Sequence, residues 1–124
     1  MRNFLRRVHP TQVVYDENKK EWRASSAAFR DEEMSCDDEN KLHSMHLNWK
    51  ATLEGYEGYS LVRLSELLVL SNSLSIVEDP IINIDAENLA HVLIKGKKRK
   101  PITNNLKEGC EPILIVLPQP VPVS

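Results

Sequence analysis

The segment EPILIVLP, residues 111–118, holds five consecutive aliphatic side chains between two prolines. A strand with one face in water alternates apolar and polar residues, whereas a strand covered on both faces has no need to alternate. We therefore predict that this segment is a central strand, or a strand packed beneath helices, in a sheet that has protein on both sides.

The chain is long enough for one such sheet. Its 124 residues can bury roughly two-thirds of the unfolded surface, which supports one hydrophobic core without disulfides. Strand-like and helix-like segments neither alternate strictly nor separate into blocks, and this order favours an α+β fold over a doubly wound sheet. We predict a single α+β domain over residues 1–117, with a mixed β-sheet packed against two to three helices, and a proline-rich C-terminal tail over residues 118–124.

The N-terminal third is predicted to contain short strands. Pro10 interrupts an apolar run there, and because proline donates no ladder hydrogen bond we expect an edge strand that kinks and resumes at Gln12. The segment RDEEMSCDDENK, residues 30–41, is predicted to be an exposed acidic loop between two very short strands, because carboxylates are rarely buried without partners.

The middle of the chain is predicted to be helical. Apolar residues recur at helical spacing over residues 40–53 and, more strongly, over residues 60–73, where Ser60 is available as an N-cap. Beyond these helices the pattern predicts strands at residues 74–79 and 90–95 and a short helix at residues 101–110 that begins with proline.

Charge and cysteine content limit the function classes. The net charge of −2 excludes a generally basic protein, so any affinity for nucleic acid must be local. Cys36 and Cys110 form no CxxC pair and are interpreted as reduced thiols. No apolar segment approaches the ~20 residues needed to span a bilayer, and no run of signal-peptide length follows the N-terminal arginines. The sequence therefore favours a cytoplasmic protein with no membrane partner.

A histidine pair is the densest set of metal-ligand types. His43 and His46 would share one helical face, with Cys36 and the neighbouring Asp37 and Asp38 close by in sequence. Zinc sites usually show paired spacings such as HExxH or CxxC, and here a fourth ligand would have to come from far away. We predict that the protein holds no metal and needs no cofactor.

A second group of residues could form a ligand pocket. It consists of Arg7, His9, Arg23, Ser25, Ser26 and His91. The arginines, with Arg6, suit bidentate contacts to phosphate, and a serine beside a histidine base could be a nucleophile, although no GxSxG elbow is present. The alternative, which we favour, is surface ion pairs and small residues in a short strand.

Five cations fall within six residues after the strand predicted at residues 90–95. They are Lys95, Lys97, Lys98, Arg99 and Lys100. The segment lacks the preceding glycine and the serine or threonine of a phosphate loop, and it has no aromatic residue to stack on a base. We interpret it as a solvated turn, with contact to phosphate or nucleic acid as the alternative.

Several short motifs resemble a group of short, uncharacterised bacterial proteins. In that group a motif like RPSSAAF, an LSV-type segment, a D-P dipeptide and a PAHA segment followed by GKK occur in this order. The counterparts here are residues 23–29, residues 34–36, Asp79 with Pro80, and residues 89–98, with Ala24 and Leu89 in place of prolines and Cys36 in place of valine. The resemblance implies a bacterial, cytoplasmic protein in which RASSAAF and LAHVLIKG are parts of one site.

These patterns lead to two functional hypotheses. The first is a small non-enzymatic accessory or binding protein within a larger bacterial protein assembly, whose edge strand and proline-rich tail contact a protein partner. The alternative is a nucleotide- or nucleic-acid-binding protein, or an enzyme, that uses the Arg/His/Ser pocket and the lysine-rich turn. The sequence leaves the oligomeric state open.

Overall fold

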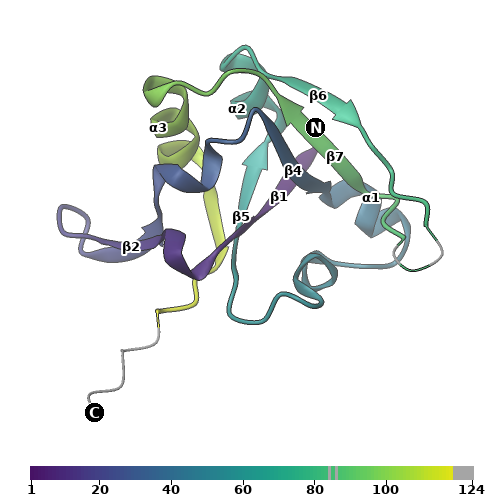
Figure 1. Cartoon of the computed structure of the whole chain (residues 1–124), viewed down its shortest axis with the longest axis horizontal. Helices are drawn as coiled ribbons and strands as arrows, with labels where there is room; N and C mark the ends of the chain where they lie inside the picture. Colours follow the sequence, from purple (N-terminus) through teal and green to yellow (C-terminus); the bar gives the residue numbers. More distant parts are fainter. Residues whose placement is uncertain (84, 86, 119–124) are drawn as a thin grey trace.

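A computed structural model describes residues 1–83, 85 and 87–118, and its architecture confirms the α+β class (Figure 1). The strands are β1 (Asn3–Val8), β2 (Val13–Asp16), β3 (Glu21–Ala24), β4 (Glu33–Asp38), β5 (Ser60–Ser65), β6 (Ser75–Glu78), β7 (His91–Lys95) and β8 (Glu111–Leu114). The α-helices are α1 (Glu39–Ser44), α2 (Glu66–Ser71) and α3 (Lys100–Gly109), and the 3-10 helices are η1 (Pro10–Gln12), η2 (Ser26–Phe29) and η3 (Trp49–Leu53).

Six strands form one sheet in the order β6-β7-β4-β1-β5-β8, and β2 pairs with β3 in a separate hairpin. Each pairing between these strands is antiparallel, where the sequence led us to expect a mixed sheet. The reason lies in the crossover through α1 and η3. It joins β4 to β5, which run in the same direction, but β1 lies between them and is antiparallel to both.

The first and last strands exchange the positions predicted for them. β1 is central, and Pro10 lies outside it in η1, so the predicted kinked edge strand is wrong. β8 is an edge strand, not a central one, because Ser60–Ser65 occupies the inner position as β5. The apolar run still contacts protein on both faces of the sheet. Ile113 packs against the hydrophobic cluster that contains Leu5, and Ile115 packs against the larger cluster that contains Phe4.

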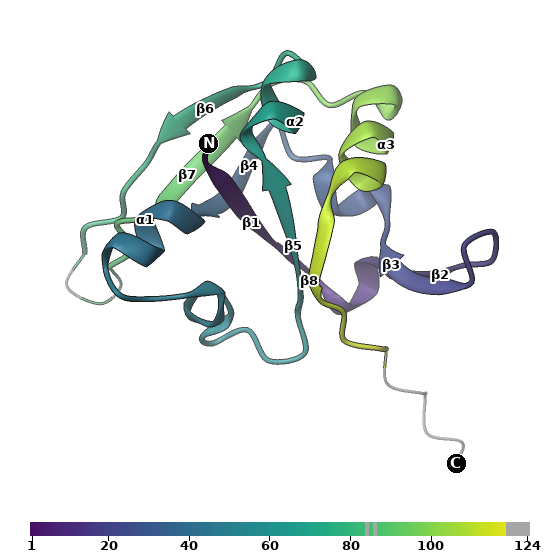
Figure 2. The same cartoon turned by 180° about the vertical axis from the view of Figure 1, so that it is seen from behind.

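Alternation along the strands divides the interior into two layers. Phe4 and Val8 of β1 belong to the main cluster, which is completed by side chains from η2, α2, α3 and the β2–β3 hairpin. Leu5 points to the other face and joins a smaller cluster with Leu42 of α1 and Leu61 of β5. In Figure 2, α2 and α3 lie together, while α1 and the following loops cover a different part of the sheet.

Both predicted central helices are broken in the structure. The helix predicted over residues 40–53 divides into α1 and η3, and His46 between them has a φ of 60°. The helix predicted over residues 60–73 begins as β5 and becomes α2 only after Ser65, whose side chain accepts a hydrogen bond from the Leu68 amide. The strands predicted at residues 74–79 and 90–95 and the helix at residues 101–110 are confirmed within one or two residues.

The predicted acidic loop is also a correction, because it forms β4 and the start of α1. Asp37, Asp38 and Glu39 are buried, and all three carboxylates have partners. Asp38 accepts from the Asn40 and Lys41 amides at the start of α1, and Glu39 forms a bidentate pair with Arg63 at 2.6 and 2.8 Å. Carboxylates that have hydrogen-bonding or charged partners can be buried in a sheet, which explains why this acidic segment is a strand and not a loop.

Both cysteines are free thiols. Burial raises the pKa of Cys36 to about 12 and that of Cys110 to about 11, so neither is a reactive thiolate at neutral pH. Across the described residues, the helices are all too short or too polar to span a bilayer.

Candidate functional site

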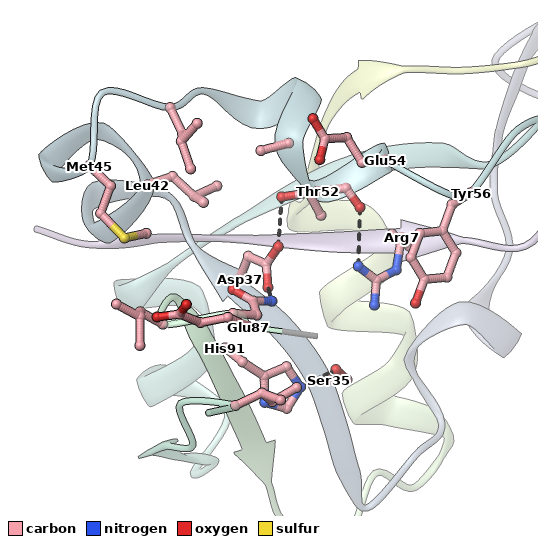
Figure 3. Close-up of a pocket in the computed structure, with 15 residues that line it drawn as sticks. Arg7, Ser35, Asp37, Leu42, Met45, Thr52, Glu54, Tyr56, Glu87 and His91 are labelled. Carbon is pink, nitrogen blue, oxygen red and sulfur yellow. Dashed lines mark hydrogen bonds between the residues drawn. The ribbon is translucent and has the colours of Figure 1, made fainter. Parts of the chain in front are cut away.

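A cavity of about 700 Å³ lies on the sheet face that carries the smaller hydrophobic cluster (Figure 3). Its floor is formed by β1, β4 and β7, and its walls by α1, by η3 with the loop after it, and by Ile81 and residues 87–89 before β7. Its apolar lining includes Leu42, Met45, Leu47, Ile81 and Leu89, and its polar lining includes Arg7, Ser35, Asp37, Thr52, Glu54, Tyr56, Glu87, Asn88 and His91.

The strand register explains why polar side chains from distant segments meet on this floor. Leu5 of β1 is opposite Asp37 of β4, and Asp37 is opposite His91 of β7. Since side chains alternate along each strand, Arg7 lies on the same face as Leu5, and Ser35 lies on the same face as Asp37. The pairing therefore presents Arg7, Ser35, Asp37 and His91 on one side of the sheet.

Asp37 anchors the walls of the cavity to its floor. Its carboxylate is buried and accepts hydrogen bonds from Thr52 Oγ1 and from Asn88 Nδ2, both at 2.8 Å. Thr52 belongs to η3 and Asn88 to the loop before β7, so one side chain holds two separate segments in place. We infer a mainly structural role for Asp37, because hydrogen bonds from the protein occupy both of its oxygens.

Arg7 differs from the other half-buried arginines. Arg2, Arg6, Arg23 and Arg63 each form a salt bridge with a carboxylate, with nitrogen-to-oxygen distances that include 3.1 Å for Arg6 and 3.0 Å for Arg23. Within the described part of the chain, Arg7 forms none. Its Nη1 donates to the Thr52 carbonyl at 3.1 Å, and its guanidinium carbon lies 3.9 Å from the centre of the Tyr56 ring. Asp37, Glu54 and Glu87 also line the cavity, but none of these carboxylates forms a salt bridge with Arg7. The guanidinium therefore lies at the cavity without a direct carboxylate partner among the described residues.

Ser35, His91 and Asp79 form a continuous hydrogen-bonded chain beside Arg7. His91 Nδ1 lies 2.9 Å from the Asp79 carbonyl oxygen and 3.1 Å from its carboxylate Oδ2. A carbonyl can only accept, so Nδ1 carries the hydrogen, and in the neutral imidazole Nε2 then accepts from the Ser35 hydroxyl, with which it is hydrogen-bonded. Both Ser35 and His91 line the cavity.

Two of the six pocket residues suggested by the sequence, Arg7 and His91, come together in this cavity. The other four, His9, Arg23, Ser25 and Ser26, lie outside its lining. His9 is exposed and accepts a hydrogen bond from the Thr11 amide at the start of η1. Arg23 pairs with Asp16 and Glu108, and these carboxylates raise its pKa against the opposing effect of burial. The pKa of Asp16 is lowered by the Lys19 amide and by Arg23, and that of Glu108 by the Lys19 ammonium group and by Arg23.

The serines of RASSAAF are held on the opposite side of the sheet. Ser25 precedes η2 and makes no capping hydrogen bond with its side chain, and Ser26 begins that helix. Phe29 of the same helix packs in the main cluster with Val92 and Ile94 of LAHVLIKG. The two segments therefore share a hydrophobic core, whereas His91 points to the cavity on the other face.

Ser35, Asp37, Thr52 and Tyr56 were not singled out from the sequence as pocket residues. The signal available for Ser35 and Asp37 was alternation, since Met34 and Cys36 between and beside them are buried apolar residues. That signal was masked by the surrounding carboxylates, which made residues 30–41 resemble a solvated loop.

The lysine-rich turn is not uniformly solvated. Lys98 is buried, and its ammonium group donates to the carbonyls of Asp31, Glu32, Ile94 and Gly96 at 2.6, 3.2, 2.9 and 3.1 Å. Desolvation lowers the pKa of this lysine. Lys95 pairs with Glu33 at 3.4 Å, which leaves the exposed Lys97, Arg99 and Lys100 available to an external anion.

The histidines proposed as metal-ligand types, His43 and His46, are both exposed. Among the described residues, no three histidine, cysteine or acidic side chains converge as metal ligands would.

Comparisons with protein family models, with curated proteins and with solved structures found no match for this chain. The resemblance to short bacterial proteins stays a prediction.

Proposed function

We propose that the protein binds a small organic anion in the cavity above β1, β4 and β7, with Arg7 as its charged contact. The observation that carries the proposal is the state of Arg7, a half-buried guanidinium that lines a cavity and forms no salt bridge with a described residue. A partly desolvated cation without a carboxylate partner gains more from an anion than an exposed one does.

The cavity has the size and composition of a small-molecule site. Its volume of about 700 Å³ lies within the range of roughly 300–1,000 Å³ that is typical of ligand pockets. Leu42, Met45 and Leu89 provide an apolar lining, and Tyr56 lies beside the cation. A molecule with a carboxylate or phosphate at one end could place that group at Arg7. An apolar or aromatic body at its other end would contact the apolar lining.

Guanidinium groups bind carboxylates and phosphates through paired N–H donors, whereas the lining near α1 offers mainly hydrophobic contact. A mononucleotide combines a phosphate with an aromatic ring, so the nucleotide-binding alternative belongs to the same ligand class. The proposal does not depend on which member of the class is bound.

Chemical-shift titrations of the ¹⁵N-labelled full chain test the proposal. The probes are benzoate, phenyl phosphate and adenosine monophosphate, with uncharged benzamide as the matched neutral compound. We expect at least one anionic probe to shift amides of β1, β4, β7 and η3 at lower concentration than benzamide does. Losing a hydrogen bond to a charged group costs about 1.5–3 kcal/mol, so Arg7→Gln should weaken this binding about tenfold or more.

Arg30→Gln is the control, because Arg30 is exposed and lies outside the cavity lining. It removes one positive charge, as Arg7→Gln does, but it should leave the affinity within about twofold. The proposal is wrong if the two variants weaken binding equally, or if none of the anionic probes shifts the cavity amides.

The other hypotheses stay predictions, including a bacterial origin and a cytoplasmic location. An accessory subunit in a larger assembly would have to use contact surfaces other than its first strand, which is central, and the tail expected to help lies, from residue 119, outside the described residues. Nucleic-acid contact by the lysine-rich turn would depend on Lys97, Arg99 and Lys100, since Lys98 is buried.

A further inference from the structure

We propose that Ser35 is a nucleophile that His91 activates and Asp79 orients, so that the cavity hydrolyses a carboxylic ester or amide of a small organic anion. The proposal deepens the proposed function, because Arg7 would hold the anionic part of the substrate. It requires an accessible hydroxyl, a base within hydrogen-bond reach and a third group that holds the base in one tautomer.

The three groups are connected in the order that this chemistry needs. Ser35 is hydrogen-bonded to His91 Nε2, and His91 Nδ1 faces both oxygen acceptors of Asp79, at 2.9 Å for the carbonyl and 3.1 Å for the carboxylate. The carbonyl alone fixes the hydrogen on Nδ1. The carboxylate adds a negative charge that stabilises the imidazolium formed when His91 takes the serine proton.

Two paired strands hold the nucleophile and the base. Ser35 is on β4, His91 is on β7, and the register Asp37 opposite His91 places Ser35 on the same face. Asp79 follows β6 directly, and its amide donates to the His91 carbonyl at 3.0 Å, so the backbone also fixes the third group. A triad built on neighbouring strands needs no loop rearrangement to bring its members together.

Ser35, His91 and Asp79 differ in how far each is exposed to solvent. Ser35 is half-buried and lines the cavity together with His91 (Figure 3). The His91 side chain is 10% exposed, and the Asp79 side chain, which is not part of the cavity lining, is 50% exposed. The nucleophile therefore faces the space where a ligand would lie, and the base is shielded from water. Arg7 lines the same cavity from β1, on the face that carries Ser35.

The reaction balances without a co-reactant other than water. Ser35 Oγ attacks the acyl carbon while its proton passes to His91 Nε2, and the resulting tetrahedral intermediate loses the alcohol or amine, which takes that proton from His91. Water then attacks the acyl-serine ester, and its proton passes to His91. Release of the carboxylic acid returns a proton to Ser35 Oγ.

A fluorophosphonate tests the nucleophile directly in the wild-type full chain. Ser35 Oγ would form a bond to phosphorus, fluoride would leave, and peptide mapping would find the added mass on the peptide that contains Ser35. The labelling rate should fall about 100-fold or more in His91→Gln, since a positioned general base contributes at least that factor. Ser35→Ala should abolish the label, and Ser71→Ala, which removes an exposed hydroxyl of α2 on the other side of the sheet, should leave it unchanged.

Hydrolysis of p-nitrophenyl hemiglutarate, which carries a carboxylate, and of neutral p-nitrophenyl butyrate tests the substrate class. Ser35→Ala should abolish the enzymatic hydrolysis of both esters. Arg7→Gln should lower kcat/KM at least fivefold more for the anionic ester than for the neutral one. Asp79→Asn should lower kcat with little change in KM, by less than His91→Gln does, because the Asp79 carbonyl still fixes the tautomer.

The outcomes separate this proposal from the one on which it rests. An unlabelled Ser35 in a wild-type protein that still binds benzoate or phenyl phosphate overturns the nucleophile and leaves anion binding intact. A label on Ser35 that forms at the same rate in folded His91→Gln overturns the role of the base. If His91→Gln does not fold, the labelled position in the wild-type chain still decides, because a label on any serine other than Ser35 overturns the proposal.

Discussion

Lys98 shows how far the environment of one side chain can depart from its sequence context. It stands among five cations, yet its ammonium group lies inside the protein and donates to four backbone carbonyls. Two of these carbonyls belong to the turn before β4 and two to the end of β7 and the residue after it. The lysine therefore joins two adjacent segments of the sheet, and it has a structural task that the exposed cations beside it do not have.

Replacing Lys98 with methionine should destabilise the protein by about 2 kcal/mol, because carbonyls that accept from a charged donor would lose it. The thioether has a similar length, so the packing of the stem is retained. Urea unfolding followed by circular dichroism measures the change as a lower midpoint with an unchanged slope.

Lys97→Met is the matched control, because Lys97 is exposed one residue earlier in the same turn. Its free energy of unfolding should stay within about 0.5 kcal/mol of the wild type. Equal midpoints for the two variants would mean that the buried ammonium contributes no net stability.

At the scale of elements, residues 60–71 show how apolar spacing can mislead. Leu61, Leu64 and Leu68 fit a helical stripe, but Leu61 and Leu64 actually lie on opposite faces of β5 and belong to different clusters. Because β5 is buried on both faces, its sequence lacks the alternation that identifies a strand. The helix begins only where Ser65 supplies a cap.

Ser65→Ala should therefore destabilise the protein by about 1 kcal/mol, the usual cost of losing an N-cap side chain. The hydroxyl accepts from the Leu68 amide at 3.1 Å, and alanine leaves that amide without its acceptor. Ser65→Asp should recover most of the loss, since aspartate caps helices as well as serine does. Thermal unfolding of both variants measures the difference, and a similar melting temperature for alanine and aspartate would contradict the role of the cap.

The sequence predicted those elements whose signals are local. The strand at residues 90–95 ends at a glycine, and α3 has Pro101 in its first turn, so both needed only neighbouring residues to be recognised. The central position of β1 could not be predicted in this way, because it depends on β4 and β5 each pairing with β1, one on either edge. The same limit applies to the site. Arg7 and His91 were identified by residue type, whereas the bond from Ser35 to His91 joins residues 56 positions apart and follows from strand pairing.

At the scale of the whole molecule, the two faces of the sheet are stabilised unequally. The main cluster joins side chains from three helices and the hairpin, including the fully buried Phe29 and Leu106. The opposite face has a smaller cluster around Leu5, Leu42 and Leu61, and the cavity lies beside it. Regions with fewer buried apolar contacts open at lower free energy than the core does. The layer of α1 and η3, which forms walls of the cavity, should therefore open without global unfolding.

Native-state hydrogen exchange tests this difference. Amides of α1 and η3 should exchange faster than those of β1 and β5. Leu106→Ala, in the main cluster, should lower global stability by about 2–5 kcal/mol and accelerate exchange in β1 and β5. Leu42→Ala, which removes an almost fully buried leucine from the other face, should accelerate exchange mainly in α1 and η3.

The pair of variants makes the test specific, because each removes the same number of atoms from one side of the sheet. If Leu42→Ala accelerates exchange in β1 and β5 as much as Leu106→Ala does, the two layers unfold together and the walls of the cavity do not open independently. If the layers are separate, an anion bound at Arg7 should slow exchange in η3, since the Thr52 carbonyl accepts from Arg7 and the Thr52 hydroxyl donates to Asp37. The segment that opens most easily would then be the one that a ligand stabilises most, while the main cluster on the other face of the sheet stays intact.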